Sequence, residues 1–128
     1  MDKLIYVCTP YRASTPEELS ENIRLAKRVC KRVLSENDVP YAPHLFFPGF
    51  LDEGNPDDRK TGMDAGMKVL ERCDALYVSG ARISEGMARE IEKAASLGIP
   101  IKCVADPRFA EERLLREIIR KGEMKNEH

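Results

Sequence analysis

The stretch "DALYVSGARISEGMAREIEKAASLGIPIKCVA", residues 74–105, contains one complete strand–helix–strand unit. "DALYVSG" (74–80) and "IPIKCVA" (99–105) are short apolar runs of the kind that form buried strands. Between them, residues 82–97 read as a turn followed by an amphipathic helix. A helix that joins two such strands indicates a parallel pair.

The strands upstream of this unit follow the same pattern. "KLIYVC" (3–8) is apolar and β-favouring, and "VPYAP" (39–43) is a brief strand bounded by prolines. Because strands and helices alternate, we predict an α/β fold: a single-domain, doubly wound parallel sheet, Rossmann- or flavodoxin-like, with about four or five strands and helices on both faces. We expect the domain to span residues 1–122, followed by a disordered tail over 123–128.

Capping signals and helical spacing place the other helices. One is expected from Thr15, as its N-cap, to about Asn37. Helical spacing resumes over residues 63–73, and a final helix is expected with Asp106 as N-cap and Pro107 at its start.

Residues 44–62 lack clear periodicity and are rich in aromatic residues, then in Pro, Gly and acidic residues. A stretch of this length in so small a domain predicts a working loop rather than a mere connector. Ligands of doubly wound folds bind outside the carboxyl ends of the strands. The site is therefore expected among "TPYRAS" (9–14), "PHLFFPGF" (43–50) and "SGARISEG" (79–86).

Composition excludes several classes of function. The fractions of hydrophobic (42%) and charged (34%) residues are those of an ordinary globular chain. A net charge of −1 gives no electrostatic reason for a nucleic acid polymer or an anionic membrane to be the main partner. No apolar run approaches the roughly 20 residues of a membrane span, and the opening Met-Asp-Lys is unlike a signal peptide.

The four cysteines, Cys8, Cys30, Cys73 and Cys103, are widely spaced and form no CxxC pair. Their apolar surroundings favour small buried thiols in a reducing compartment, and we expect a cytoplasmic protein. No metal site is expected, because the chain has only two histidines and no ligand spacing.

One residue of the helix within 82–97 departs from the amphipathic pattern. On an ideal helical wheel, Glu90 falls inside the apolar arc rather than on the charged side. A buried carboxylate costs several kcal/mol unless it is solvated or hydrogen-bonded. Close to the helix start it would be anionic and partly shielded from water, which suits a nucleophile. The alternative is a glutamate at the edge of a cleft that pairs with an Arg or Lys.

Several residues near the same edge are candidates for binding. Ser84 and Gly86 open the helix and could hold an anion, or serve only as a cap. Arg12 follows the first strand and could direct a bidentate cation at the site, or remain solvated. His44 with Phe46 and Phe47 could form an aromatic slot for a planar ring, or the aromatic side chains could close the core or an oligomer contact.

Three segments together carry a resemblance to a known family: "IYVCTPYR", "CDALYVSG" and "SEGMAREIEKAASLGIPI". They resemble the nucleoside 2-deoxyribosyltransferase-like superfamily, which includes the 2'-deoxynucleoside 5'-phosphate N-hydrolases. "YAPHLFFPGFLD" and "LERCDALYVSG" resemble a subgroup of small bacterial and phage proteins within it. The resemblance spans about residues 3–104.

The resemblance implies roles for individual residues. Glu90 matches the glutamate that attacks the anomeric carbon of the sugar, and Tyr6 matches a tyrosine that positions it. Ser84 matches a residue that is typically Asp in the nucleoside transferases and Ser in the nucleotide hydrolases. Arg12 matches a phosphate contact, and Thr9 matches a small hydroxyl position in the same loop. These last three matches favour a 5'-phosphorylated substrate.

The sequence departs from the family at one position. Where the family has an inward-facing Asp on the helix before the third strand, this chain has Gly66, with Asp64 nearby on the polar side of the helix. Candidates for the missing second acid are Asp64, Glu85 and an acidic residue in the 52–58 stretch.

The resulting expectation is cleavage or transfer of the N-glycosidic bond of a nucleotide, with a covalent intermediate on Glu90 and no metal or redox cofactor. One alternative is a module of the same fold that binds a nucleotide, or a signal derived from one, without turnover. Another is an assembly protein. The resemblance implies a homodimer or larger homo-oligomer in each case.

Overall fold

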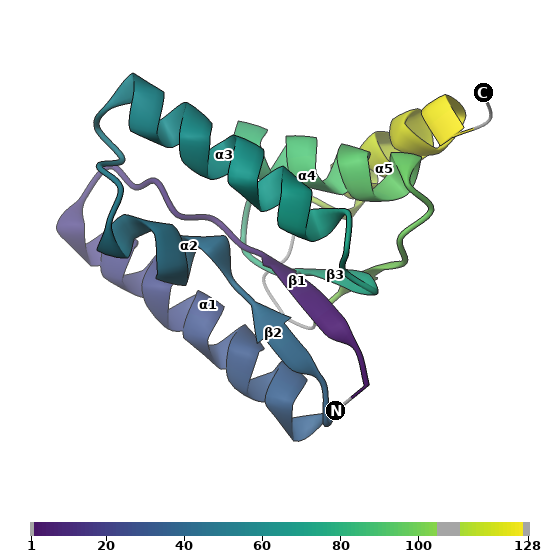
Figure 1. The fold of residues 1–128 in the computed structure, drawn as a ribbon, viewed down its shortest axis with the longest axis horizontal. Helices are drawn as coiled ribbons and strands as arrows, with labels where there is room; N and C mark the ends of the chain where they lie inside the picture. Colours follow the sequence, from purple (N-terminus) through teal and green to yellow (C-terminus); the bar gives the residue numbers. More distant parts are fainter. Residues whose placement is uncertain (1, 105–110, 127–128) are drawn as a thin grey trace.

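The protein is described by a computed structural model over residues 2–104 and 111–126. Its centre is a sheet of four strands in the order β2-β1-β3-β4, and all neighbouring pairs are parallel (Figure 1). The strands are β1 (Leu4–Cys8), β2 (Val39–Tyr41), β3 (Ala75–Val78) and β4 (Ile101–Cys103). The predicted doubly wound α/β fold is confirmed, and each predicted strand is present.

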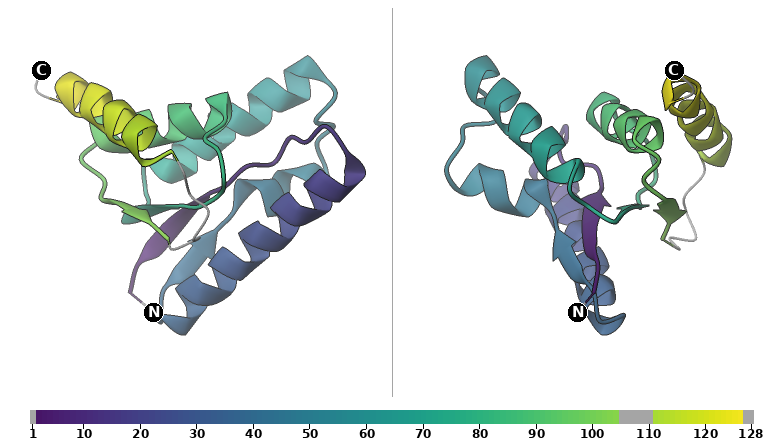
Figure 2. Two further views of the ribbon diagram at one scale, coloured as in Figure 1. Left: turned by 180° about the vertical axis from the view of Figure 1, so that it is seen from behind. Right: turned by 45° about the vertical axis from the view of Figure 1, so that its right-hand side comes forward.

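Helices cover both faces of the sheet. The chain leaves β1 through α1 (Pro16–Ser35) and returns to β2 on one side of β1. It then crosses to β3 through α3 (Pro56–Leu70), and α4 (Glu85–Ser96) joins β3 to β4. Viewed from behind, α1 lies in front of the sheet and α3 lies behind it (Figure 2). The order of the strands therefore reverses direction between β1 and β3, where such folds bind ligands.

The last helix, α5 (Glu112–Asn126), packs along α4. A Cβ atom at Gly122 would lie 2.5 Å from the carbonyl oxygen of Glu92, so the glycine permits this close contact between the helices. The helix continues to Asn126, four residues past the expected domain boundary at residue 122. Asp106 and Pro107, the expected start of this helix, lie outside the described residues.

The central strand β1 has two chemically different sides. Ile5 and Val7 belong to an apolar cluster with Val29 and Val33 of α1. Tyr6 and Cys8 point to the opposite side, into a cluster that α3 and α4 also line. This alternation follows from the two-residue period of a strand. It places two polar side chains beneath α4.

Local capping explains where the helices begin. Thr15 accepts a hydrogen bond from the backbone N–H of Glu18 at 3.1 Å, so its predicted role as an N-cap is confirmed. At the start of α4, the side chain of Ser84 accepts from the N–H of Met87 at 3.2 Å. Each cap satisfies one of the amides that a helix start leaves without an internal partner.

The prediction of a loop over residues 44–62 is wrong in part. The segment contains α2 (Pro43–Phe46), the 3-10 turn η1 (Phe47–Gly49) and the first two turns of α3. The side chain of Asn55 caps α3 by accepting from the N–H groups of Asp57 and Asp58. "NPDD" is thus a helix-start signal of cap, proline and two acidic residues that outweighs the poor apolar periodicity.

All four cysteines lie within the described residues and none forms a disulfide. Cys8 and Cys73 are buried as expected, whereas Cys30 is half-buried and Cys103 is exposed. Cys103 lies on β4, a strand at the edge of the sheet, which explains why the apolar run around it is not fully covered. Among the described helices, none has the length and apolarity that a membrane span requires.

Candidate active site

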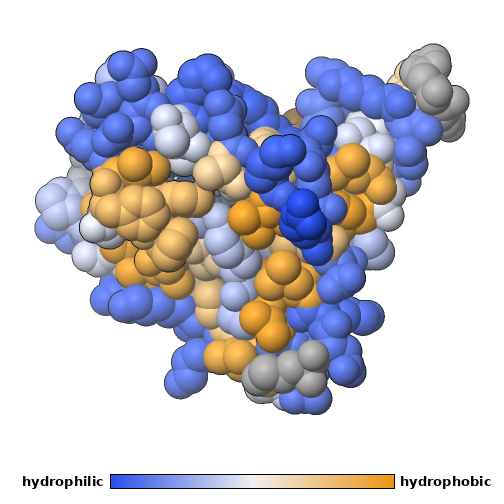
Figure 3. Space-filling model, viewed as in Figure 1, coloured by the Kyte–Doolittle hydropathy of each residue, from blue (hydrophilic) through white to orange (hydrophobic). Residues whose placement is uncertain are grey.

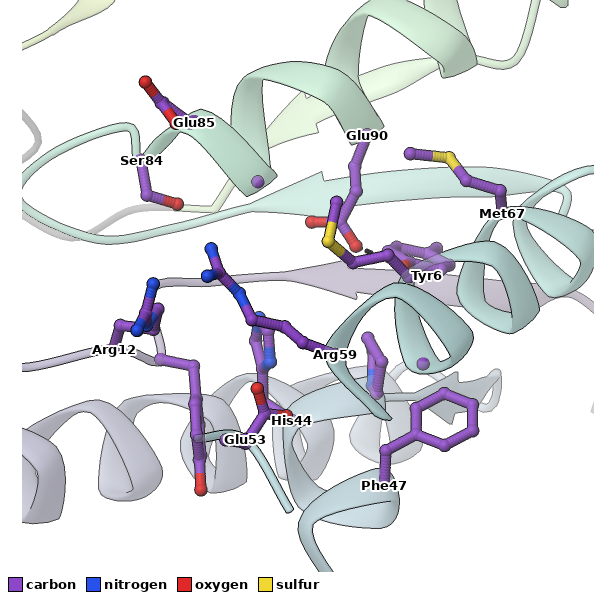
Figure 4. Close-up of a pocket in the computed structure, with 15 residues that line it drawn as sticks. Tyr6, Arg12, His44, Phe47, Glu53, Arg59, Met67, Ser84, Glu85 and Glu90 are labelled. Atoms are coloured by element: carbon purple, nitrogen blue, oxygen red, sulfur yellow. Dashed lines mark hydrogen bonds between the residues drawn. The ribbon is translucent and has the colours of Figure 1, made fainter. Parts of the chain in front are cut away.

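A cavity of about 270 Å³ opens at the carboxyl ends of β1, β2 and β3 (Figure 4). Its walls come from the segments that follow these strands and from α3 and α4, as the sequence predicts. The residues that line it are Tyr6, Tyr11, Arg12, Pro43, His44, Phe47, Glu53, Arg59, Gly62, Met63, Met67, Ser84, Glu85, Gly86 and Glu90.

Glu90 is the buried carboxylate at the inner end of this cavity. It leaves α4 on the side that faces β1, and 9% of its surface is exposed. The hydroxyl of Tyr6 donates a short hydrogen bond to Oε2 of Glu90. The thiol of Cys8 lies 3.6 Å from the other carboxyl oxygen, Oε1. No ion pair to Glu90 is present among the described residues, so the alternative of an Arg- or Lys-paired glutamate does not apply to this structure.

Burial controls the protonation of this group. It raises the pKa of Glu90 from the ordinary 4.5 to about 7, against the opposing effect of the hydrogen bonds from Tyr6 and Cys8. The pKa of Tyr6 is raised strongly, first by burial and then by the Glu90 carboxylate, so Tyr6 stays a donor at any physiological pH. Glu90 therefore changes charge near neutral pH, in contact with two donors that favour its anionic form.

The other end of the cavity is rich in cations and amide donors. The guanidinium groups of Arg12 and Arg59 point into it from opposite walls (Figure 4). Neither forms an ion pair with any residue in the described parts of the chain. Ser84 faces the same space, and the amides of Glu85 and Gly86 belong to the helix turn that lacks internal acceptors. Together these groups can bind an anion.

The start of α4 is held in place by the chain that leads into α5. The backbone N–H of Ile83 donates to the carboxylate of Glu111 at 2.7 Å. The side chain of Glu85, one residue into the helix, points away from the cations in Figure 4. The first turn of α4 thus presents its amides, rather than its own carboxylate, to the cavity.

One wall of the cavity is aromatic. The rings of Tyr11 and His44 stack with centroids 5.0 Å apart and an angle of 19° between their planes. Burial lowers the pKa of His44 to about 4, so the imidazole is neutral and can stack as a flat polar ring. Met63 and Met67 of α3 also line the cavity. This lining suits a planar ring of mixed polarity.

A second carboxylate reaches the cavity wall. Glu53, from the segment between η1 and α3, is half-buried and lines the cavity. The pKa of Tyr11 is raised first by burial and then by the charge of Glu53. Within residues 2–104 and 111–126, no group of three or more His, Cys, Asp or Glu side chains is arranged to hold a metal ion.

Three of the expected site residues lie elsewhere. Asp64 is exposed on the outer side of α3, where it pairs with Lys60 at 2.7 Å. Thr9 is buried outside the cavity, and its hydroxyl finds no partner among the described residues. Phe46 is 56% exposed and contacts Phe47 and Phe50, so only Phe47 of these three reaches the cavity. Figure 3 shows the apolar surface that they form over α2 and η1.

The absence of an acid at position 66 has a structural reason. Gly66 is buried where α3 crosses Tyr6, and a Cβ atom there would lie 3.1 Å from the tyrosine hydroxyl. The tyrosine thus fills the space that an inward side chain of α3 would need.

Arg59 is the main cavity residue that sequence analysis missed. The sequence signal for it is the start of α3 at Pro56. A helix that begins there places four cavity residues on one face: Arg59, Gly62, Met63 and Met67.

Comparisons with known proteins agree with this fold. A solved 2-deoxyribosyltransferase from the psychrotolerant bacterium Bacillus psychrosaccharolyticus aligns with a TM-score of 0.63 and 13% identity. The alignment covers 84% of this chain and 80% of that one, and it shows that the two chains share a fold. A search of curated proteins finds no match. The model of the domain of unknown function DUF7768 matches residues 3–104, most of the chain, and the protein therefore belongs to the DUF7768 family.

Proposed function

We propose that this protein cleaves or transfers the N-glycosidic bond of a nucleoside 5'-monophosphate. The observation that carries the proposal is a buried carboxylate, Glu90, in one cavity with two guanidinium groups that form no ion pair within the described residues. A carboxylate nucleophile and an anion site at opposite ends of one cavity suit a substrate that has a reactive sugar carbon and a phosphate. The fold shared with a 2-deoxyribosyltransferase supports the same class of chemistry.

In the proposed reaction, a carboxylate oxygen of Glu90 attacks C1' of the sugar while the bond from C1' to the base nitrogen breaks. The bonding electron pair leaves with the base, which takes up a proton. A glycosyl ester on Glu90 remains. Water, or the N–H nitrogen of a second base, then attacks C1', passes a proton to the group that protonated the leaving base, and releases the Glu90 carboxylate. The pKa of Glu90, about 7, makes the ionised nucleophile available at neutral and higher pH.

Glu53 is our proposed source of the proton for the leaving base. Of the acidic residues considered from sequence, it lines the cavity, whereas Asp64 is on the outer surface and Glu85 points away from the cations. The base would lie near the stacked rings of Tyr11 and His44. Tyr11 is close enough to Glu53 for the charge of this carboxylate to act on it.

The 5'-phosphate would bind at the cationic end. Arg12 and Arg59 match the two negative charges of a phosphomonoester, and the Ser84 hydroxyl and first-turn amides of α4 supply further donors. This arrangement favours a nucleotide over an uncharged nucleoside.

The test is release of free base, followed by chromatography, from matched panels of ribo- and deoxyribonucleoside 5'-monophosphates and the corresponding nucleosides. We expect release from at least one monophosphate, faster than from its nucleoside, and a loss of at least about 10³-fold in Glu90→Gln. Glu92→Gln is the matched control, because Glu92 lies on the same helix but pairs with Lys125. Equal release by the wild type and Glu90→Gln would refute the nucleophile.

A nucleotide-binding module without turnover is the second candidate. Gly66 favours it, since α3 brings no carboxylate to the place where Tyr6 meets Glu90. In the same panel, this function predicts tight binding of a monophosphate by calorimetry, weakened in Arg12→Gln and Arg59→Gln, with no base released.

A further inference from the structure

Cys8 is a buried thiol that lies next to the carboxylate of Glu90. Its side chain is fully buried at the end of β1 and does not line the cavity. Its sulfur lies 3.6 Å from Oε1 of Glu90 and 3.9 Å from the carbonyl oxygen of Met87. The carboxylate is the nearer acceptor and the more strongly negative one, so the S–H hydrogen is directed to Glu90.

The two hydrogen bonds to Glu90 come from a single strand. Tyr6 donates to Oε2 and Cys8 faces Oε1, and these residues are two apart on β1, on the side that faces α4. The spacing is that of successive side chains on one face of a strand. Because each carboxyl oxygen has its own donor, rotation of the carboxyl group about its last bond is restricted.

We propose that Cys8 is a positioning residue that orients the Glu90 carboxylate and stabilises its anionic form through the S–H···Oε1 contact. Any effect of Cys8 on the reaction rests on the proposed function. The geometric effect on Glu90 does not, because it concerns the carboxylate whether or not a substrate reacts there. Cys8 itself touches no substrate in this arrangement.

The surroundings of Glu90 leave few other groups that could have this effect. From β1 the titratable groups that face it are Tyr6 and Cys8. From β2, Tyr41 has its pKa raised to about 12, first by burial, then by Cys73 and last by Glu90. The hydroxyl of Tyr41 forms no hydrogen bond among the described residues, so it is not a donor to Glu90. Arg12, Arg59 and Glu53 line the same cavity without contacting Glu90 directly.

The experiment measures the pKa of Glu90 itself. In protein labelled with ¹³C at the glutamate carboxyl, the Glu90 signal is assigned by its loss in Glu90→Gln and is followed over pH 4–9. Cys8→Ala removes the donor and is expected to raise the pKa of Glu90 by about 0.5–1, because a hydrogen bond to the charged form is lost. Cys8→Ser keeps a donor and is expected to hold the pKa close to that of the wild type.

Cys73→Ala is the matched control. Cys73 is a buried thiol of the same core cluster, but its S–H donates to the carbonyl oxygen of Val69 at 3.3 Å. Its removal therefore creates a similar small void without touching Glu90. If Cys8→Ala does not fold, Cys8→Val fills the site without a donor and carries the same expectation.

The outcomes separate the two proposals. A pKa of Glu90 unchanged in the donor-free variant, or raised equally in Cys8→Ser and in Cys73→Ala, would overturn the positioning role. A raised pKa in a protein that releases no base would uphold the positioning of Glu90 and refute the reaction. Where base is released, the acidic limb of the pH–rate profile is expected to move up with the pKa of Glu90 in Cys8→Ala and to return in Cys8→Ser.

Discussion

The two sides of β1 show how one strand serves stability and chemistry separately. Toward α1 it presents Ile5 and Val7, which are buried in a mainly apolar cluster with Val29 and Val33. Toward α4 it presents Tyr6 and Cys8, which surround the carboxylate of Glu90. Both sides are almost fully removed from water. The two sides differ in the effect of burial on stability. Burial of apolar atoms stabilises the fold, whereas burial of polar atoms destabilises it unless hydrogen bonds compensate.

On the polar side, hydrogen bonds offset only part of the free-energy cost of burying the Glu90 carboxylate. Two donors hold the Glu90 carboxylate, yet its pKa remains above the ordinary value because burial is the largest effect. The ionised Glu90 carboxylate therefore lowers the stability of the fold at neutral pH, and apolar burial on both sides of the sheet has to offset that cost. Such a division is common where a protein keeps a reactive group ready.

The largest effect on stability is expected on the apolar side of β1. Ile5→Ala removes buried methyl groups from the centre of the sheet and is expected to lower the free energy of unfolding by about 2–5 kcal/mol. The pKa of Glu90 should not change, because Ile5 faces the other way. Urea denaturation measures the first quantity and carboxyl ¹³C NMR the second.

Val39→Ala is the control for this change, since Val39 lies on the edge strand β2 and is 38% exposed. Its cost should stay below about 1 kcal/mol. A change in the pKa of Glu90 in Ile5→Ala would show that the two sides of β1 are coupled, contrary to this division.

The polar side is tested by the dependence of stability on pH. The pKa of Glu90 is about 7 in the folded protein and has the ordinary value of 4.5 when the chain unfolds. Between these values the folded state binds more protons, so wild-type stability falls as the pH rises and stays at the lower level above pH 7. Glu90→Gln removes this loss, and its stability relative to the wild type should rise by about 2.5 kcal/mol between pH 5 and pH 8.

Urea titrations of both proteins at pH 5, 6, 7 and 8 give this difference directly. Glu92→Gln should follow the wild-type pH dependence over the same range, because the pKa of Glu92 is lowered by Lys125 rather than raised. Parallel curves for the wild type and Glu90→Gln would mean that Glu90 is not buried as an acid with a raised pKa.

Much of this architecture could be predicted from sequence because it rests on local patterns. The four strands are short apolar runs, and the burial of Glu90 follows from its place on the helical wheel of α4. The wheel likewise predicted that Asp64 is solvated, and Asp64 is exposed. Its candidacy as an acid came from the family pattern instead, which does not fit a helix whose inner face carries Gly66.

The remaining features depend on tertiary structure or on weaker signals. Thr9 comes directly after β1, and continuing the alternation of the strand would place its side chain with Ile5 and Val7, away from the cavity. Its place among the site candidates came from the family resemblance instead. Arg59 enters the cavity only because α3 starts at Pro56, a start marked by capping residues rather than by apolar spacing. The contact of Tyr6 with Glu90 joins residues 84 apart in the chain, which no single-sequence pattern specifies.

The smallest expected effect lies where α3 meets the polar side, at Gly66. In Gly66→Ala, the better helix propensity of alanine contributes up to about 1 kcal/mol, and crowding of the new methyl group against Tyr6 opposes it. The added Cβ would lie 3.1 Å from the tyrosine hydroxyl, which must shift by a few tenths of an ångström. We therefore expect a net stability change within about 1 kcal/mol, together with a raised pKa of Glu90 as its bond from Tyr6 weakens.

Gly62→Ala, one turn earlier on α3, separates propensity from crowding. Its Cβ would lie 3.3 Å from Cδ1 of Leu51, a flexible side chain that can move aside, and 3.9 Å from Cγ of Phe47, an ordinary van der Waals contact. This variant should gain stability in urea denaturation while the Glu90 carboxyl titrates as in the wild type. Because the two substitutions are chemically identical and lie on one helix, any difference in the pKa of Glu90 must come from the contact with Tyr6. Equal gains in stability and equal titrations would show that Tyr6 has room to spare, and that α3 takes no part in holding the carboxylate.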